Sequence, residues 1–194
     1  MRIILAAGFL LVGVCGAAPA LAQSPWTFEG VAFPEQAGWC PKTAQQDDGS
    51  GGKVSALEVR PCGKALPFLS VTLGVRGAAP QNIASFTAKA ADISAGPDGM
   101  TTVDNLFKAK SPSCARLTYS MDRNPVSGLA AFLVHATYSC PALSADAYQF
   151  NNLTTYAQQR NGNLWVVAYD QDSPTLTEMD KAMIRSAVAA IATN

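Results

Sequence analysis

The chain has 194 residues, of which 48% are hydrophobic, so it is long and apolar enough to build one domain with a sizeable core. Its 14 Lys and Arg balance its 14 Asp and Glu, and only 14% of its residues are charged. This balance provides no electrostatic footprint for nucleic acid or for an anionic membrane surface, and neither is expected as a partner.

An export signal is predicted at the N-terminus. Arg2 precedes an uncharged apolar run over 3–14, which has the length and flanks of a signal-peptide core. The small residues of Ala20-Leu21-Ala22 then provide a cleavage site. We therefore expect residues 1–22 to be a signal peptide cleaved after Ala22, and residues 23–194 to form a single mature domain that is periplasmic or secreted.

Two other uses of this segment are less well supported. Pro19 breaks the apolar run well short of the roughly 20 residues that a membrane-spanning helix requires, so no membrane span is expected in the mature form. Lipidation at Cys15 would need a small residue directly before it, and Val14 occupies that position.

The first part of the mature chain is predicted to be mostly β-structure. Broken alternation of apolar residues around Gly30 indicates a strand over 26–33, either regular or with a bulge. A short return begins at Trp39, and alternating or β-branched residues predict further strands over 53–59 and 66–75.

A helix is predicted next, and it is expected to stop at Gly96 in the left-handed conformation. Its apolar residues recur at intervals of three and four: Ile83, Phe86, Ala90 and Ile93. Residues 101–108 are weakly patterned and are predicted to form an edge strand.

The last part of the chain predicts two hairpins and a terminal helix. Strands over 115–123 and 129–140 form the first hairpin, and Asn161-Gly162 marks the turn between strands over 151–160 and 163–169. Thr175 and Glu178 have the spacing of a capping box. The helix that follows carries an apolar stripe made by Leu176, Met179, Met183, Ala187 and Ile191.

This order of elements predicts an α+β fold in which an antiparallel β-sheet is flanked by two helices. Such a sheet is the economical way to bury the apolar stripe of each helix.

Removal of the signal leaves four cysteines, an even number that favours disulfides in an oxidising compartment: Cys40, Cys62, Cys114 and Cys140. Three pairings are formally possible. Cys40 and Cys62 are symmetric about Gly51 in a glycine-rich turn, and Cys114 and Cys140 are symmetric about Ser127, so two hairpins would bring each pair opposite. We predict Cys40–Cys62 and Cys114–Cys140 as structural bridges. A redox role lacks a Cys-x-x-Cys motif, and zinc lacks close cysteine pairs.

No residue constellation specifies a reaction. His135 is the only histidine. Its position in the predicted strand places it on the other face of the sheet from Phe132, Val134 and Ala136, and a structural role is expected there. Two carboxylate pairs, Asp47-Asp48 and Asp170 with Asp172, are too few for calcium, and no metal or other cofactor is expected.

Two further features are assigned no function. Asn152-Leu153-Thr154 matches a glycosylation sequon, which we interpret as chance in a chain with a bacterial-type signal. Trp26, Trp39 and Trp165 are expected in the core, and only their clustering on an exposed face would indicate a binding surface.

Three segments give the chain a resemblance to a known family. Phe33-Pro34-Glu35-Gln36-Ala37-Gly38-Trp39 is similar to the opening motif of the PsbP-like family, and the helix around Phe86 and the closing strand 164–169 followed by the helix 179–191 extend the resemblance over most of the mature chain. The resemblance implies an α/β/α sandwich that binds or stabilises partner proteins without catalysis. The four cysteines are not part of the family pattern.

Three functions are therefore weighed. The leading hypothesis is an exported, non-enzymatic protein-interaction or assembly module whose partner is another exported or envelope protein. The alternative is a carrier of a small apolar ligand held between sheet and helix, which a cavity lined by Phe68, Phe86, Phe132 or Trp165 would favour. An enzyme centred on His135 would require an open cleft with a carboxylate and a hydroxyl in reach.

Overall fold

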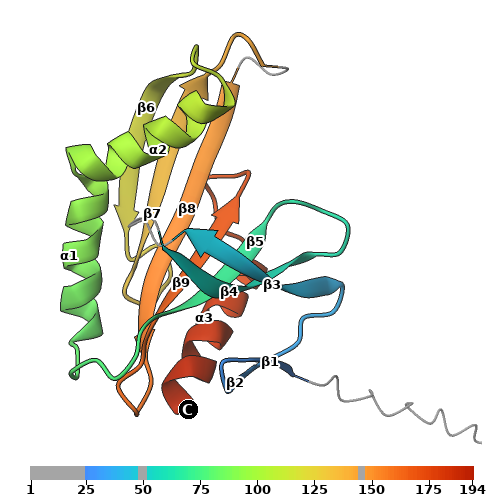
Figure 1. Ribbon diagram of the computed structural model, residues 1–194, viewed down its shortest axis with the longest axis vertical. Coiled ribbons are helices and arrows are strands. Elements are labelled where there is room, and N and C mark those ends of the chain that lie inside the picture. The colour runs from blue at the N-terminus through green and yellow to red at the C-terminus, as the bar shows by residue number, and fades with distance from the viewer. Residues whose placement is uncertain (1–24, 48–51, 144–146) are drawn as a thin grey trace, which may run out of the picture.

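The computed structural model describes residues 25–47, 52–143 and 147–194 (Figure 1). Within these ranges, a seven-stranded antiparallel sheet has the order β3-β4-β5-β9-β8-β7-β6, and the hairpin β1-β2 is separate from it. The strands are β1 (Trp26–Phe28), β2 (Val31–Phe33), β3 (Trp39–Asp47), β4 (Lys53–Pro61), β5 (Phe68–Val75), β6 (Ala115–Arg123), β7 (Ala131–Ser139), β8 (Ala147–Gln158) and β9 (Leu164–Gln171). The helices are α1 (Ile83–Ala95), α2 (Pro97–Lys110) and α3 (Glu178–Thr193). The predicted α+β class with an antiparallel sheet is confirmed.

The helices cover opposite faces of the sheet (Figure 1). Successive residues of a strand point to opposite faces, and β7 shows both sides. Phe132 and Val134 pack in one cluster with Ala91 of α1, whereas Leu133 packs in the cluster that contains Ile184 of α3. The α3 face holds the larger core.

The N-terminal segment forms a hairpin of two strands where the sequence predicted one strand, regular or bulged. Phe28 pairs with Val31, so Glu29 and Gly30 are the two turn residues. Both have positive φ, 49° and 79°, which is the geometry of a two-residue turn that matches the twist of the flanking strands. The break in alternation at Gly30 therefore marks a turn.

The edge strand predicted over 101–108 is wrong, because these residues belong to α2. Pro97 starts this helix at a position where a missing N–H costs nothing, and Met100 and Phe107 are buried at helical spacing. The β-branched run at 101–103 favoured a strand locally. Burial of the apolar face of α2 against β6 and Tyr138 of β7 overrides that preference.

Helix α1 differs from its prediction in how it ends and in the face it buries. Gly96 is extended, with φ −72° and ψ 169°, because Pro97 follows it and disfavours the helical conformation in the preceding residue. The residues buried against the sheet are the small Thr87 and Ala91, and Ile93 of the predicted stripe is 62% exposed.

Helix α3 begins two residues later than predicted. Its capping box joins Thr177 and Asp180: the Thr177 hydroxyl accepts from the Asp180 N–H at 3.2 Å, and Asp180 Oδ2 accepts from the Thr177 N–H at 2.7 Å. Asp180 is buried and also accepts a hydrogen bond from the Tyr169 hydroxyl, which fixes the start of the helix over β9.

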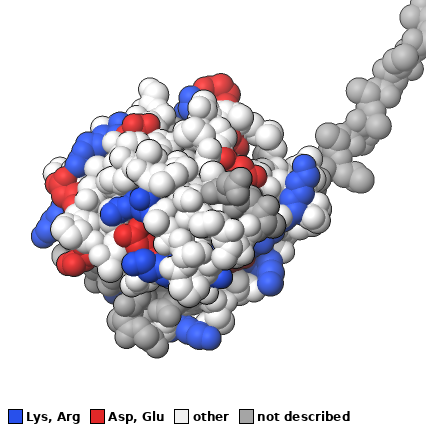
Figure 2. Space-filling view, turned by 90° about the horizontal axis from the view of Figure 1, so that it is seen from above, with Lys and Arg blue, Asp and Glu red and all other residues white. Residues whose placement is uncertain are grey.

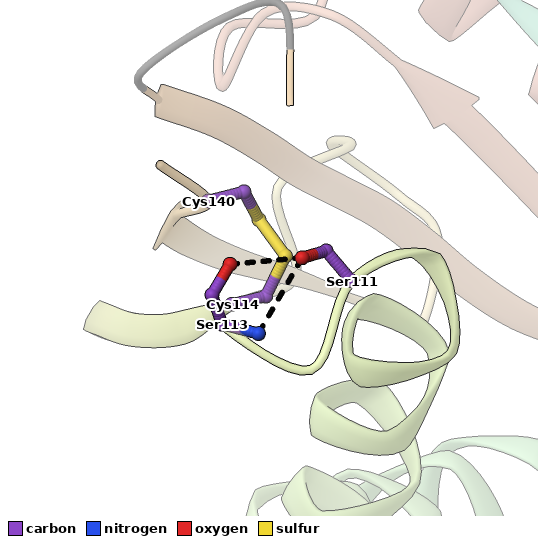
Figure 3. The surroundings of a disulfide bond; sticks show 4 residues. All are labelled: Ser111, Ser113, Cys114 and Cys140. Atoms are coloured by element: carbon purple, nitrogen blue, oxygen red, sulfur yellow. Dashed lines mark hydrogen bonds between the residues drawn. A yellow bond between two sulfur atoms is a disulfide. The ribbon is translucent and has the colours of Figure 1, made fainter. Parts of the chain in front are cut away.

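Both predicted disulfides are confirmed. Cys114 and Cys140 extend the β6–β7 ladder by one pair beyond Ala115 and Ser139, as symmetry about Ser127 predicts. Figure 3 shows this bridge beside Ser111, which lies directly after α2. The bridge joins the start of β6 to the end of β7, and the Cys114 N–H donates to the Ser111 carbonyl oxygen at 3.0 Å, which links this end of the hairpin to the end of α2.

The first disulfide forms with a register that differs from its prediction. Cys40 stands opposite Arg60, and Cys62 lies just beyond the end of β4, where its N–H donates to the carbonyl oxygen of Gly38 at 3.0 Å. The bridge is therefore diagonal across the open end of the hairpin. Both of its cysteines are exposed, whereas Cys114 and Cys140 are buried.

The two disulfides indicate an oxidising environment. The predicted signal peptide lies outside the described residues. In the part of the chain that the structure describes, no helix combines the length and the hydropathy needed to cross a bilayer. On the face shown in Figure 2, Lys and Arg are interspersed with Asp and Glu, without a large patch of one sign.

Candidate functional site: an apolar pocket beside helix α3

An apolar pocket of about 310 Å³ lies between α3, the sheet and the segment that follows β2. Its floor is made by two cross-strand pairs of β4 and β5, Leu57 with Val71 and Val59 with Leu69. All four side chains are buried and point to the α3 face, so the floor offers no polar group.

Helix α3 forms one wall and leaves the space open. It packs mainly on β8, β9 and β2, so it does not fill the region above β4 and β5. The side chains that it presents there are mostly small or flexible: Met179, Ala182, Met183, Ser186 and Ala187. Met179 is 54% exposed and stands at the rim, where an unbranched thioether side chain can adapt to a ligand.

The N-terminal segment closes the opposite side. Trp26 and Phe33 are directly opposite each other in the β1–β2 hairpin, and both line the pocket. Pro34, Glu35 and Gln36 continue this wall after β2 ends. Trp26 is half-buried, while Phe33 is buried and contacts Trp165 edge to face, with ring centroids 6.3 Å apart.

Polar side-chain groups are few among the described residues of this lining. They are those of Glu35, Gln36 and Ser186 and the indole N–H of Trp26. Glu35 is half-buried, and within the described ranges its carboxylate has no hydrogen-bond or ion-pair partner. An apolar floor with a few polar groups at one side is the usual form of a small-molecule site.

No protein-family model matches this chain, and no curated protein matches it in sequence. The resemblance to the PsbP-like family therefore stays a prediction.

The four residues predicted to line a ligand cavity do not meet. Trp165 is fully buried on the α3 face, behind Phe28 and Phe33. Phe132 is buried on the opposite face under α1, and Phe86 of α1 contacts Tyr156 edge to face at 4.9 Å. Phe68 lies on the same face as Phe132, and the guanidinium carbon of Arg60 stands 5.1 Å from the centroid of its ring. None of the four lines the apolar pocket.

His135 lies on the predicted face, beside Leu133, and is held on both sides. Its Nδ1 is 3.0 Å from Oδ1 of Asn151, and its Nε2 is 3.1 Å from Oδ2 of Asp122. Both ring nitrogens therefore already have partners on neighbouring strands. Ser120 is the cross-strand neighbour of His135, but none of the pockets described includes either residue.

Of the carboxylates that the sequence suggested for calcium, those within the described residues are not part of the pocket lining. Asp170 accepts a hydrogen bond from Asn152 at 3.0 Å, and Asp172 is exposed. Burial raises the pKa of the Asp170 carboxyl; the bond from Asn152 partly offsets this and the charge of Glu58 adds to it. Asp48 lies outside the described residues. Among those residues, no group of three or more His, Cys, Asp or Glu could hold a metal ion.

The sequon and two of the tryptophans have structural roles. Asn152 is half-buried in the inner strand β8 and bonded to Asp170, so it is not on an exposed loop. Trp39 and Trp165 are buried, as expected. Trp26 is the tryptophan that lines the candidate site. The sequence around Trp26 does not distinguish it from the two buried tryptophans.

Proposed function

We propose that this protein binds a small apolar ligand in the pocket beside α3. The observation that carries the proposal is the pocket itself: it has a volume of about 310 Å³ and an apolar floor, and it is left open because α3 packs mainly on β8, β9 and β2. The pocket opens to solvent, and its apolar floor distinguishes it as a candidate site, because small-molecule sites are concave and mostly apolar.

The volume limits the size of the ligand. An engineered protein cavity of about 150 Å³ holds one benzene ring, so about 310 Å³ has room for roughly two fused rings or a chain of similar bulk. Binding of a body this small is expected in the micromolar-to-millimolar range, because affinity scales with the number of ligand atoms. Two flexible methionines at the wall would let the pocket accept more than one shape.

Titration with a neutral bicyclic probe tests the proposal. Naphthylmethanol should bind the mature protein with a stoichiometry of one in isothermal titration calorimetry. Ala182→Phe places a large ring in the pocket and should abolish this heat, whereas Ala189→Phe, on an exposed position of the same helix, should leave it unchanged. Absence of binding to the unmodified protein, or equal binding by both variants, would refute the proposal.

The setting of this function is also a proposal. We infer that the chain is exported to the periplasm or secreted, with residues 1–22 removed, and the disulfides support this. We also infer that the fold is a PsbP-like α/β/α sandwich, which the placement of helices against both faces of the sheet supports. No catalytic role is assigned.

A protein-interaction role remains the second candidate, and α1 carries the observation that favours it. Phe86, Ala90 and Ile93 line a shallow groove of about 620 Å³ on this helix, together with the polar residues Gln81, Asn82, Ser85 and Lys89. Ile93 is 62% exposed, and exposed apolar side chains rimmed by polar residues mark interaction surfaces. A photo-crosslinking residue placed at Ile93 in the exporting cell should capture one protein partner. The same residue at Leu117, exposed on the edge strand β6, is the control, and equal capture at both positions would count against the role.

A further inference from the structure

We propose that the ligand of the α3 pocket carries a positive charge, as a protonated amine attached to an apolar body. This inference rests on the proposed function and adds the chemical class of the ligand. It is carried by the charge of the lining and by the aromatic residues next to that charge.

Among the described residues that line the pocket, Glu35 is the only charged one. It is half-buried, and within the residues that the structure describes no cation or hydrogen-bond donor satisfies its carboxylate. The oxygens of this carboxylate are not buried, so water reaches them in the unliganded protein. A ligand that covered the carboxylate with apolar atoms alone would remove that water without replacing it, which is costly. A ligand ammonium removes the cost, whereas a ligand carboxylate would meet a like charge.

The residues beside Glu35 in the lining include two aromatic side chains. Phe33 and Trp26 form a directly opposed pair in the hairpin that Glu35 follows, and both line the pocket. Aromatic rings attract cations through the negative charge of their faces, and Trp does so most strongly. A carboxylate together with aromatic side chains is the combination that recognises an alkylammonium group.

One feature nearby offers an opposite preference. Lys42 lines a neighbouring hollow of about 210 Å³ that shares Trp26 and Leu57 with the pocket. A ligand that extended past Trp26 could place an anionic group there. Lys42 is not part of the pocket lining, so the cation is favoured for a ligand that stays within it.

Three probes with the same bicyclic body separate these possibilities: naphthylmethylamine, naphthylmethanol and naphthoate. In calorimetric titrations of the mature protein at neutral pH, the amine should bind about tenfold more tightly than the alcohol, which corresponds to one charge-assisted interaction, and naphthoate should bind most weakly. Glu35→Gln should weaken the amine about tenfold and leave the alcohol unchanged. Glu29→Gln is the matched control, because Glu29 precedes β2 in the same hairpin but pairs with Arg76 outside the lining.

The outcomes distinguish this inference from the function on which it rests. If naphthoate binds most tightly, or if the preference for the amine survives Glu35→Gln, the inference is wrong while the pocket remains a binding site. If none of the three probes binds, or if Ala182→Phe weakens none of them, the pocket is not a binding site and the inference falls with it. Binding of the amine with loss of preference in Glu35→Gln, and not in Glu29→Gln, supports it.

Discussion

The two disulfides close loops of similar length in very different surroundings, and this difference predicts unequal contributions to stability. Their sequence separations of 22 and 26 residues give about 3.4 and about 3.5 kcal/mol of unfolding free energy from restriction of the unfolded chain. Cys40 and Cys62 are exposed, so replacing both with alanine should cost little beyond this amount. The expected fall in Tm is roughly 7–14 °C for a domain of this size.

The second disulfide should cost more to remove. Cys114 is 4% exposed and Cys140 is fully buried, and both pack with Met100, Phe107 and Tyr138. Replacing this pair with alanine also deletes two buried sulfur atoms, each comparable to a buried methylene at about 1 kcal/mol. The total expected loss is therefore about 5.5 kcal/mol, and the two double variants should differ by about 2 kcal/mol.

Urea unfolding of the mature protein measures this difference. Each variant lacks one cross-link of similar span, so the change in the unfolded state is similar and the difference between their extrapolated free energies reports burial. The reasoning is refuted if the Cys40 and Cys62 variant loses as much stability as the Cys114 and Cys140 variant. Under native conditions, a mild thiol reductant followed by alkylation and mass spectrometry should open Cys40–Cys62 first. Earlier opening of the buried bridge would contradict the same argument.

Three further substitutions test other parts of the structure. Thr177→Ala should lower the free energy of unfolding by about 1 kcal/mol, because the N-cap of α3 is lost. The control Thr175→Ala should change it by less than about 0.5 kcal/mol. If thermal denaturation shows the larger loss for Thr175→Ala, the N-cap is Thr175, as the sequence suggested, and not Thr177. The folded state holds a proton on Asp170 at pH values above the ordinary value of 3.8, so stability from this group is full below that value and is lost as the pH rises through the raised pKa. Asp170→Asn should therefore raise Tm at neutral pH, with a gain that disappears in acid; a gain that is constant with pH would contradict this. Gly162→Ala should destabilise the protein more than Gly63→Ala in chemical denaturation. Both glycines have positive φ, but only at Gly162 would the new Cβ clash, with the carbonyl oxygen of Ala78 at 2.6 Å. Equal losses of stability in the two variants would show that this clash does not matter.

The sequence by itself determined most of the elements and the cysteine pairing, because those signals are local. Alternation and turn residues located most strands of the large sheet, and Asn161-Gly162 marked a hairpin whose loop is longer than two residues, since β8 ends at Gln158 and β9 begins at Leu164. Symmetry about two turns was enough to choose one disulfide pairing from three. A shift of two residues in the first hairpin did not change that choice, because a diagonal pair of cysteines at the open end still lies close enough to bond.

Only the tertiary structure decided which faces are buried and where the pocket lies. The strand predicted at 101–108 became a helix because Met100 and Phe107 find a partner surface on the sheet, which no local window contains. The sequence predicted a cavity lined by Phe68, Phe86, Phe132 or Trp165. The pocket instead has an aliphatic floor, and two other aromatic residues, Trp26 and Phe33, stand at its side. It requires two strand pairs, the small side chains of α3 and the segment after β2 to converge, and these parts are up to about 150 residues apart in the chain. Glu35 shows the same limit: in the sequence it is one residue of a family-like motif, and only its position against the pocket gives its carboxylate a candidate partner.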